Sequence, residues 1–184
     1  MEAALSKEEC AQLVKDSAKF YNDFPKPGVT FMDLFSLTSK PDVFEKLNLS
    51  TAKIIKEEVG EFNVIVGLES RGFVQGPILA QHFKVPFVPI RKKGKLPGEC
   101  HQIAYGTEYS QDVCEIQKDS LPAGSKVLIV DDLLATGGTL KAAESLISMI
   151  DGAEVVASYC LFEIPALKGK DKLAGKFVCI ASLD

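Results

Sequence analysis

Residues 126–139 read KVLIVDDLLATGGT, and the rest of the predicted structure is arranged around this stretch. Its apolar part, residues 127–130, is short, uninterrupted and rich in β-branched side chains, which is typical of a strand buried on both faces of a parallel sheet. Two adjacent acids, Asp131 and Asp132, follow at the carboxyl end of this strand. A glycine-bearing turn then opens a helix that we predict over residues 138–150. The stretch therefore predicts a strand, a ligand-binding turn and a helix in direct succession.

The turn has the chemistry of a phosphate site. It offers closely spaced backbone N–H groups and two hydroxyls at a helix N-terminus, from Ala135, Thr136, Gly137, Gly138 and Thr139. The carboxylates of Asp131 and Asp132 suit the vicinal diol of a sugar, so the combined ligand is a ribose 5-phosphate. Taken alone, the acids could be a helix cap and the glycines an ordinary turn. The ordered set favours binding, although two better-known phosphate motifs, G-x-G-x-x-G and Gly-Lys-Ser/Thr, are absent.

Composition limits the other possibilities. A length of 184 residues with 46% hydrophobic content predicts one domain with one substantial core. A net charge of −4 argues against general binding to nucleic acid or membranes. The five cysteines are an odd number without C-x-x-C spacing, which favours reduced thiols over a disulfide framework or a zinc site. With no secretory pattern at the N-terminus and no stretch long enough to span a membrane, we expect a cytoplasmic protein.

Strands and helices alternate along the chain. A capping box at residues 6–9, SKEE, predicts the start of a first helix, and apolar spacing predicts further helices over 39–59 and about 73–83. Pro77 is tolerable in the latter if it lies in the first turn. Apolar runs predict strands over 62–67, 85–90, 126–130, 155–162 and 176–180. This alternation predicts an α/β fold with an open, mostly parallel, Rossmann-like sheet flanked by helices.

Two regions depart from this alternation. Residues 1–37 are expected to form a small N-terminal hood, in which residues 29–34 are a short strand or a binding segment. Residues 96–125 are polar and punctuated by glycine, with weakly β-like arms at 100–105 and 113–117. A long excursion of this kind inside a compact domain is usually functional, so we expect a flexible hairpin loop.

Charged loops follow three of the predicted strands. Residues 69–72 read ESRG, residues 91–95 read RKKGK, and residues 131–139 contain the acids and the turn. Because ligands of open α/β sheets bind beyond the carboxyl ends of the strands, we expect these loops to converge. A lone basic run is more often a solvated loop. Opposite a phosphate-binding turn, however, the cations indicate a second, polyphosphate group.

These motifs also carry a resemblance. The segment VLIVDDLLATGGT resembles the phosphoribosyl pyrophosphate signature of the type I phosphoribosyltransferases. Four further segments resemble, in order, the adenine phosphoribosyltransferase branch of that family: FPKPGVTF at 24–31, GLESRGF at 67–73, IRKKGKLPG at 90–98 and FEIPALKGKDKL at 162–173. The similarity spans nearly the whole chain, and it implies a single phosphoribosyltransferase domain over residues 1–184, with a base-recognition hood at 1–37 and a catalytic loop at 96–125.

The resemblance implies a role for each matching residue. Ribose and 5-phosphate would be bound by Asp131, Asp132, Ala135, Thr136, Gly137, Gly138 and Thr139. Pyrophosphate would be bound by Glu69, Ser70, Arg71, Arg91, Lys92, Lys95 and Tyr109. Adenine would be bound by Thr30, Phe31, Met32 and Leu133, and Glu108 would be the catalytic residue. The peptide bond between Glu69 and Ser70 is expected to be cis.

The implied activity is purine salvage by a glycosyltransferase that moves 5-phosphoribosyl from phosphoribosyl pyrophosphate to N9 of adenine, giving AMP and pyrophosphate. Magnesium would be bound mainly through the substrate, with no dedicated protein ligands, and the chain would form a homodimer without nucleic-acid or membrane partners. Two residues depart from the family pattern: Met32 stands where arginine is frequent, and Ser110 where glycine is frequent. The alternatives are a transferase for another base and a non-catalytic sensor of phosphoribosyl pyrophosphate.

Overall fold

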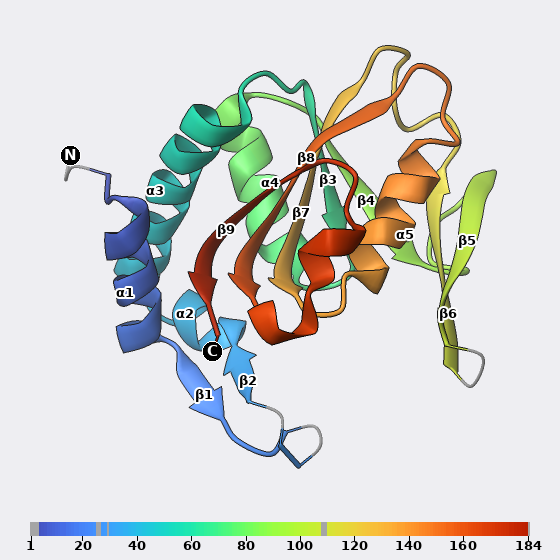
Figure 1. The fold of residues 1–184 in the computed structure, drawn as a ribbon. Coiled ribbons are helices and arrows are strands. Elements are labelled where there is room, and N and C mark those ends of the chain that lie inside the picture. The colour runs from blue at the N-terminus through green and yellow to red at the C-terminus, as the bar shows by residue number, and fades with distance from the viewer. Residues whose placement is uncertain (1–3, 25–26, 29, 108–109, 184) are drawn as a thin grey trace.

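The structure is a computed structural model that describes residues 4–24, 27–28, 30–107 and 110–183. Within this part of the chain, seven strands form one sheet in the order β5-β6-β4-β3-β7-β8-β9. The strands β3 (Val64–Leu68), β4 (Phe87–Lys92), β7 (Lys126–Leu134), β8 (Glu154–Glu163) and β9 (Lys176–Ser182) are parallel. At one edge the hairpin of β5 (Cys100–Thr107) and β6 (Ser110–Gln117) adds antiparallel pairs (Figure 1). The predicted open, mostly parallel α/β sheet is confirmed.

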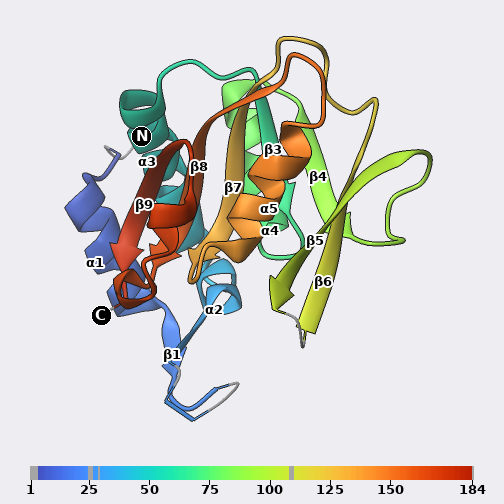
Figure 2. The same ribbon diagram turned by 45° about the vertical axis from the view of Figure 1, so that its right-hand side comes forward.

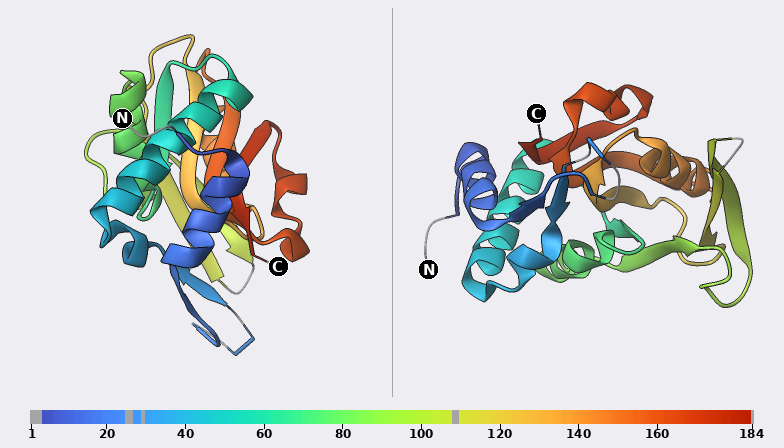
Figure 3. Two further views of the ribbon diagram at one scale, coloured as in Figure 1. Left: turned by 90° about the vertical axis from the view of Figure 1, so that its left-hand side faces the viewer. Right: turned by 90° about the horizontal axis from the view of Figure 1, so that it is seen from below.

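Helices cover both faces of the sheet. On one face lie α1 (Lys7–Ser17), α3 (Pro41–Val59) and α4 (Gly72–Phe83), and on the other lies α5 (Gly138–Ile147) (Figures 2 and 3). Each face has its own apolar core, because alternate residues of the buried strands point to opposite sides: Leu128 packs with the first group of helices and Ile129 with α5. None of the helices in the described residues is long and apolar enough to cross a membrane.

The local structure agrees with some of the features predicted from sequence motifs and differs from others. The capping box is confirmed, since Ser6 Oγ accepts from the Glu9 N–H at 3.2 Å and Glu9 Oε2 accepts from the Ser6 N–H at 2.7 Å. The condition on Pro77 is not met: α4 begins at Gly72, so Pro77 lies beyond its first turn, inside the helix. The strand β7 is also longer than predicted, because its pairing with β8 continues through Leu134. Asp131 and Asp132 are therefore among its last residues rather than beyond its end.

Near the N-terminus, a short hairpin lies at the carboxyl ends of the parallel strands. Residues 19–21 form β1 (Lys19–Tyr21), which pairs antiparallel with β2 (Phe31–Asp33), and α2 (Leu34–Thr38) follows. The arrowheads of β7, β8 and β9 point toward this hairpin in Figure 1. The predicted short strand within 29–34 is confirmed for residues 31–33. The sequence did not predict β1, because three exposed residues give no periodicity.

The long excursion at 96–125 is fastened to the sheet at its base. Its arms are confirmed as β5 and β6, and β6 pairs with β4. The buried carboxylate of Glu115 accepts hydrogen bonds from the N–H groups of Lys95 (2.9 Å) and Leu96 (3.0 Å), and from Gln102 Nε2 (3.0 Å). Because β5 runs in the same direction as β4, its last residue, Thr107, lies at the carboxyl end of the sheet.

Candidate active site

A cavity of about 270 Å³ opens at the carboxyl ends of β3 and β7. It contains most of the predicted sugar-phosphate and pyrophosphate residues, and one predicted base contact: Glu69, Ser70, Arg71, Lys92, Asp131, Asp132, Leu133, Ala135, Thr136, Gly137, Gly138 and Thr139. These residues come from separate loops that the parallel topology brings to one edge of the sheet. The expected convergence of the charged loops is therefore confirmed as geometry.

Two carboxylates, those of the half-buried Asp131 and the buried Asp132, line the cavity. The N–H group of Asp132 donates to Asp131 Oδ1 at 2.9 Å, and Asp132 Oδ2 lies 3.0 Å from Arg71 Nε. Burial raises the pKa of Asp131 well above its ordinary value, and repulsion from Asp132 adds to the rise. Burial also raises the pKa of Asp132, and the positive charge of Arg71 opposes that rise. Arg71 is thus the cation that lowers the pKa of both carboxyl groups and partly offsets the effect of burial.

The position of Arg71 follows from the close approach of α4 to β7. A Cβ atom on Gly72 would lie 2.4 Å from the carbonyl oxygen of Val130, so only glycine lets the helix begin against this strand. Arg71, at the N-cap of α4, is thereby held beside Asp132. The guanidinium of Arg71 also lies 5.4 Å from the ring centroid of Phe31, a distance typical of a cation–π contact. The hairpin β1–β2 is therefore connected to the acidic pair through one side chain.

The turn after β7 presents unpaired donors. Gly137 has φ +80°, a conformation that favours glycine, and it is the N-cap of α5 without a side-chain cap. The first N–H groups of a helix have no intrahelical partner, and they carry the positive end of the helix dipole. This turn can therefore bind a phosphate dianion.

On the other side of the cavity, Glu69 organises the charged loop after β4. Arg91 donates to both carboxylate oxygens of Glu69, each at 3.1 Å, and the N–H group of Lys92 donates to Oε2 at 3.0 Å. The hydrogen bonds from Arg91 hold the pKa of Glu69 below its usual value. The peptide bond between Glu69 and Ser70 is cis, as predicted.

Some predicted residues lie apart from the cavity. Arg91 is occupied by Glu69 and by the Lys95 carbonyl oxygen at 3.0 Å, and the Lys95 side chain is exposed outside the cavity. Thr30 is exposed and donates to Asn22 Oδ1 at 3.3 Å. The side chain of Met32 is buried in the core and does not line the cavity. Glu108 and Tyr109 lie outside the described residues.

The structure also adds residues that the sequence did not indicate. Tyr105 and Asp112, which are paired across β5 and β6, line the cavity together with Leu134 and Leu140. Burial raises the pKa of Tyr105, and the charge of Asp112 adds to the rise. The only available signal was the alternation in the hairpin arms, where Ile103 and Tyr105 point to the core side.

Comparison with known proteins identifies this architecture. Residues 36–181 match the model of the phosphoribosyl transferase domain. The chain is 44% identical over 162 residues to the adenine phosphoribosyltransferase of Ruminiclostridium cellulolyticum, covering 88% of this chain and 94% of that protein. It is 47% identical over 163 residues to the corresponding protein of Rattus norvegicus, covering 88% and 90%.

A solved structure gives the same result. The adenine phosphoribosyltransferase of Saccharomyces cerevisiae, complexed with D-2,5-dideoxy-2,5-imino-altritol 1,6-bisphosphate and adenine, aligns with a TM-score of 0.88 at 42% identity, over 94% of this chain and 98% of that chain. The chain therefore belongs to the phosphoribosyltransferase family and, within it, to the adenine phosphoribosyltransferase branch.

Proposed function

We infer that this protein transfers the 5-phosphoribosyl group of phosphoribosyl pyrophosphate to N9 of adenine, giving AMP and pyrophosphate in purine salvage. The observation that carries this inference is that one cavity combines the Asp131–Asp132 pair with the open N-terminus of α5. The pair suits the ribose hydroxyls, and the helix start suits the 5-phosphate. The Saccharomyces cerevisiae relative, with its bound bisphosphate and adenine, supports the same pairing of ligands.

Residues at the carboxyl ends of β3 and β4 would bind the pyrophosphate group. Ser70, Arg71 and Lys92 line the cavity opposite the turn, where their donors and charges can neutralise a leaving pyrophosphate. Tyr109 is the proposed contact from the hairpin tip. Arg91 and Lys95 would act less directly, because Arg91 is hydrogen-bonded to Glu69, and Lys95 lies on the outer side of the loop. In a homodimer, which we also propose, such outward cations can serve the neighbouring site.

The base would lie between the cavity and the N-terminal hairpin. Leu133 lines the cavity, and the ring of Phe31 lies against Arg71 at its edge. These two apolar groups would hold the two faces of adenine, while backbone groups at Thr30 and Met32 would read its edge. Arginine at position 32 is not required for this, because the side chain there points into the core. The hood at residues 1–37 thereby acts as the base-recognition part of one domain over residues 1–184.

Magnesium fits the site as a substrate-bound ion. Among the described residues there is no group of three or more histidine, cysteine, aspartate or glutamate side chains that could hold a metal. Asp132 is paired with Arg71, so oxygens of the ligand and water would supply most of the coordination. When bound, the ion would neutralise charge on the pyrophosphate. The chain itself orients the sugar through Asp131 and Asp132 and holds the leaving group through Arg71.

Catalysis would be completed by the loop at 96–125. With its base fastened through Glu115, this loop would close over the cavity and exclude water from the activated sugar. Glu108, carried by this loop, would take part in proton transfer at the purine. A cytoplasmic location completes the proposal for such a salvage enzyme.

The decisive experiment is product analysis with adenine, phosphoribosyl pyrophosphate and magnesium, followed by chromatography. We expect AMP and pyrophosphate in equal amounts. In competition, adenine should be consumed in preference to hypoxanthine, guanine and pyrimidines. A preference for another base would favour the alternative transferase. Binding of phosphoribosyl pyrophosphate without any nucleotide product would favour a non-catalytic sensor.

Replacing Glu108 with glutamine is expected to lower kcat by about 100-fold, the usual contribution of a positioned acid–base group. The amide keeps the size of the side chain but cannot exchange a proton with the purine. Binding of phosphoribosyl pyrophosphate, measured by calorimetry, should stay at the wild-type level. Full turnover by Glu108→Gln would remove this residue from the mechanism.

A further inference from the structure

The chain between β8 and β9 packs against the turn that we assign to the 5-phosphate. This connection includes two short 3₁₀ helices, η1 (Pro165–Leu167) and η2 (Gly169–Lys172), and we call its residues 168–175 the strap. A Cβ atom on Gly169 would lie 2.2 Å from the Ala135 carbonyl oxygen and 2.9 Å from the Gly137 nitrogen. A Cβ atom on Gly137 would lie 2.4 Å from the Gly169 carbonyl oxygen. The two backbones touch without room for a methyl group, so the strap supports the turn from behind.

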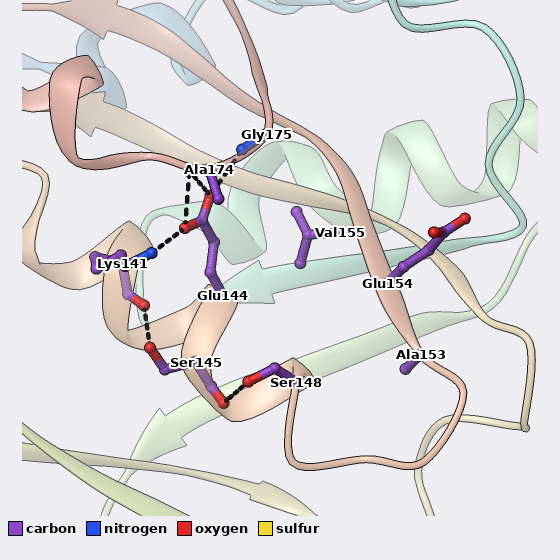
Figure 4. Close-up of a pocket in the computed structure, with 9 residues that line it drawn as sticks. All are labelled: Lys141, Glu144, Ser145, Ser148, Ala153, Glu154, Val155, Ala174 and Gly175. Carbon is purple, nitrogen blue, oxygen red and sulfur yellow. Dashed lines mark hydrogen bonds and ion pairs between the residues drawn. The ribbon is translucent and has the colours of Figure 1, made fainter.

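The far end of the strap is tied to α5 by a buried carboxylate. Glu144, only 6% exposed, accepts through Oε1 from the N–H groups of Ala174 at 3.0 Å and Gly175 at 3.4 Å. Its other oxygen accepts from Lys141 Nζ at 3.1 Å. Figure 4 shows Glu144 reaching from the helix to the backbone at 174–175, with Lys141 beside it. Hydrogen bonds to an ionised acceptor are roughly twice as strong as neutral ones, so this tie is firm.

The helix α5 and the turn at its start thus contact the strap near both of its ends. The helix α5 carries the turn at its N-terminus and Glu144 about two helical turns later. We propose that Glu144 is a positioning residue for the 5-phosphate: by fastening the strap at residues 174–175, it keeps Gly169 pressed against Gly137. The N–H groups at the start of α5 then hold the geometry that the phosphate requires. Glu144 does not line the cavity itself, and its role rests on the proposed function of that cavity.

Replacing Glu144 with glutamine tests this role. Glutamine keeps one acceptor oxygen but loses the charge, and it turns an NH₂ group toward either Lys141 or the strap. We expect the dissociation constants of AMP and of ribose 5-phosphate to rise about 10-fold, because small displacements of a binding group have effects of this order. The KM for phosphoribosyl pyrophosphate should rise similarly. The KM for adenine and the inhibition constant of inorganic pyrophosphate, which has no 5-phosphate, should stay unchanged.

The matched control is Glu154→Gln. It makes the same chemical change at an exposed residue that lines the same surface pocket as Glu144 (Figure 4). It should leave all these constants at wild-type values. Glu144→Asp retains the charge and should recover part of the AMP affinity; it also serves as the test variant if Glu144→Gln does not fold. Equal weakening of AMP and pyrophosphate, or a lower Tm with unchanged AMP affinity, would overturn the proposal. Failure of the wild-type protein to make AMP would instead refute the proposed function.

Discussion

Replacing Arg71 with methionine is expected to lower kcat/KM for phosphoribosyl pyrophosphate by about 1000-fold, since both electrostatic stabilisation of the leaving group and a buried ion pair are lost. Arg71 lies 3.0 Å from Asp132 and lines the cavity on the pyrophosphate side. Methionine fills similar volume without charge, so the half-buried Asp131 and the buried Asp132 are left without the Arg71 counterion. The measurement is initial-rate kinetics with each substrate varied in turn.

The same variant should have a shifted pH profile. Binding of the ribose hydroxyls requires ionised carboxylates, so activity falls as pH drops through the raised pKa of the Asp131–Asp132 pair. Because Arg71 is the cation that lowers this pKa, its removal moves the acid limb of the profile to higher pH.

Folding stability should also depend on pH, and the raised pKa of the Asp131–Asp132 pair sets the direction of that dependence. A raised pKa means that the folded state binds more protons than the unfolded state between the ordinary and the raised value. The folded state therefore loses stability as pH rises from the ordinary pKa to the raised pKa of the Asp131–Asp132 pair. In Arg71→Met the raised pKa is higher still, so this loss continues to a higher pH. The loss of Tm should be largest near neutral pH and smaller in acid.

The control for this experiment is Lys118→Met, which removes one positive charge from an exposed pair with Glu99 at 2.9 Å. Solvent screens exposed pairs so strongly that they contribute little, so rates and pH profile should remain those of the wild type. If Arg71→Met left the acid limb in place, Arg71 would not be the counterion that sets the titration of the acidic pair.

The site was predictable where chemistry is concentrated in short contiguous motifs. The acids and the turn at residues 131–139 identify themselves through residue type and order, and topology brings residues 69–72 to them. Contacts made by isolated residues were not predictable. Tyr105 and Asp112 enter the cavity through the pairing of β5 with β6, and apart from the alternation in the hairpin arms no motif in the sequence marks either one. The contact between Phe31 and Arg71 likewise depends on where the N-terminal hairpin lies.

For the fold, burial decided which predictions succeeded. Fully apolar strands such as β3 and helices with a capping signal such as α1 are specified by local pattern. The incorrect predictions concern places where tertiary packing overrides the local sequence pattern. Pro77 is tolerated inside α4, a helix that begins at Gly72 because its N-terminus packs directly against β7. The strand β7 carries two acids because pairing with β8 and the Arg71 ion pair stabilise them there.

Replacing Gly137 with alanine is expected to lower kcat/KM for phosphoribosyl pyrophosphate by about 1000-fold, because it displaces several preorganised phosphate donors at once. Stability should fall by about 3 kcal/mol, of which about 1–2 reflect the left-handed conformation and the remainder overpacking against Gly169. For a chain of this size that corresponds to a Tm lower by about 6–12 °C. Kinetics, AMP binding and thermal unfolding are the measurements.

Alanine substitutions at three other glycines separate the cost of the left-handed conformation from the cost of overpacking. Gly124 has φ +78° with nothing within 4 Å of an added Cβ, so Gly124→Ala should show the conformational cost alone, about 1–2 kcal/mol. Gly169→Ala should show the steric cost, because its Cβ would meet Ala135 and Gly137. In Gly138→Ala the nearest atom would be Thr136 Oγ1 at 3.9 Å, so stability should hardly change. If Gly137→Ala were no more harmful than Gly124→Ala, the strap would yield to the methyl group, and the contact between Gly137 and Gly169 would not be what fixes the phosphate-binding turn.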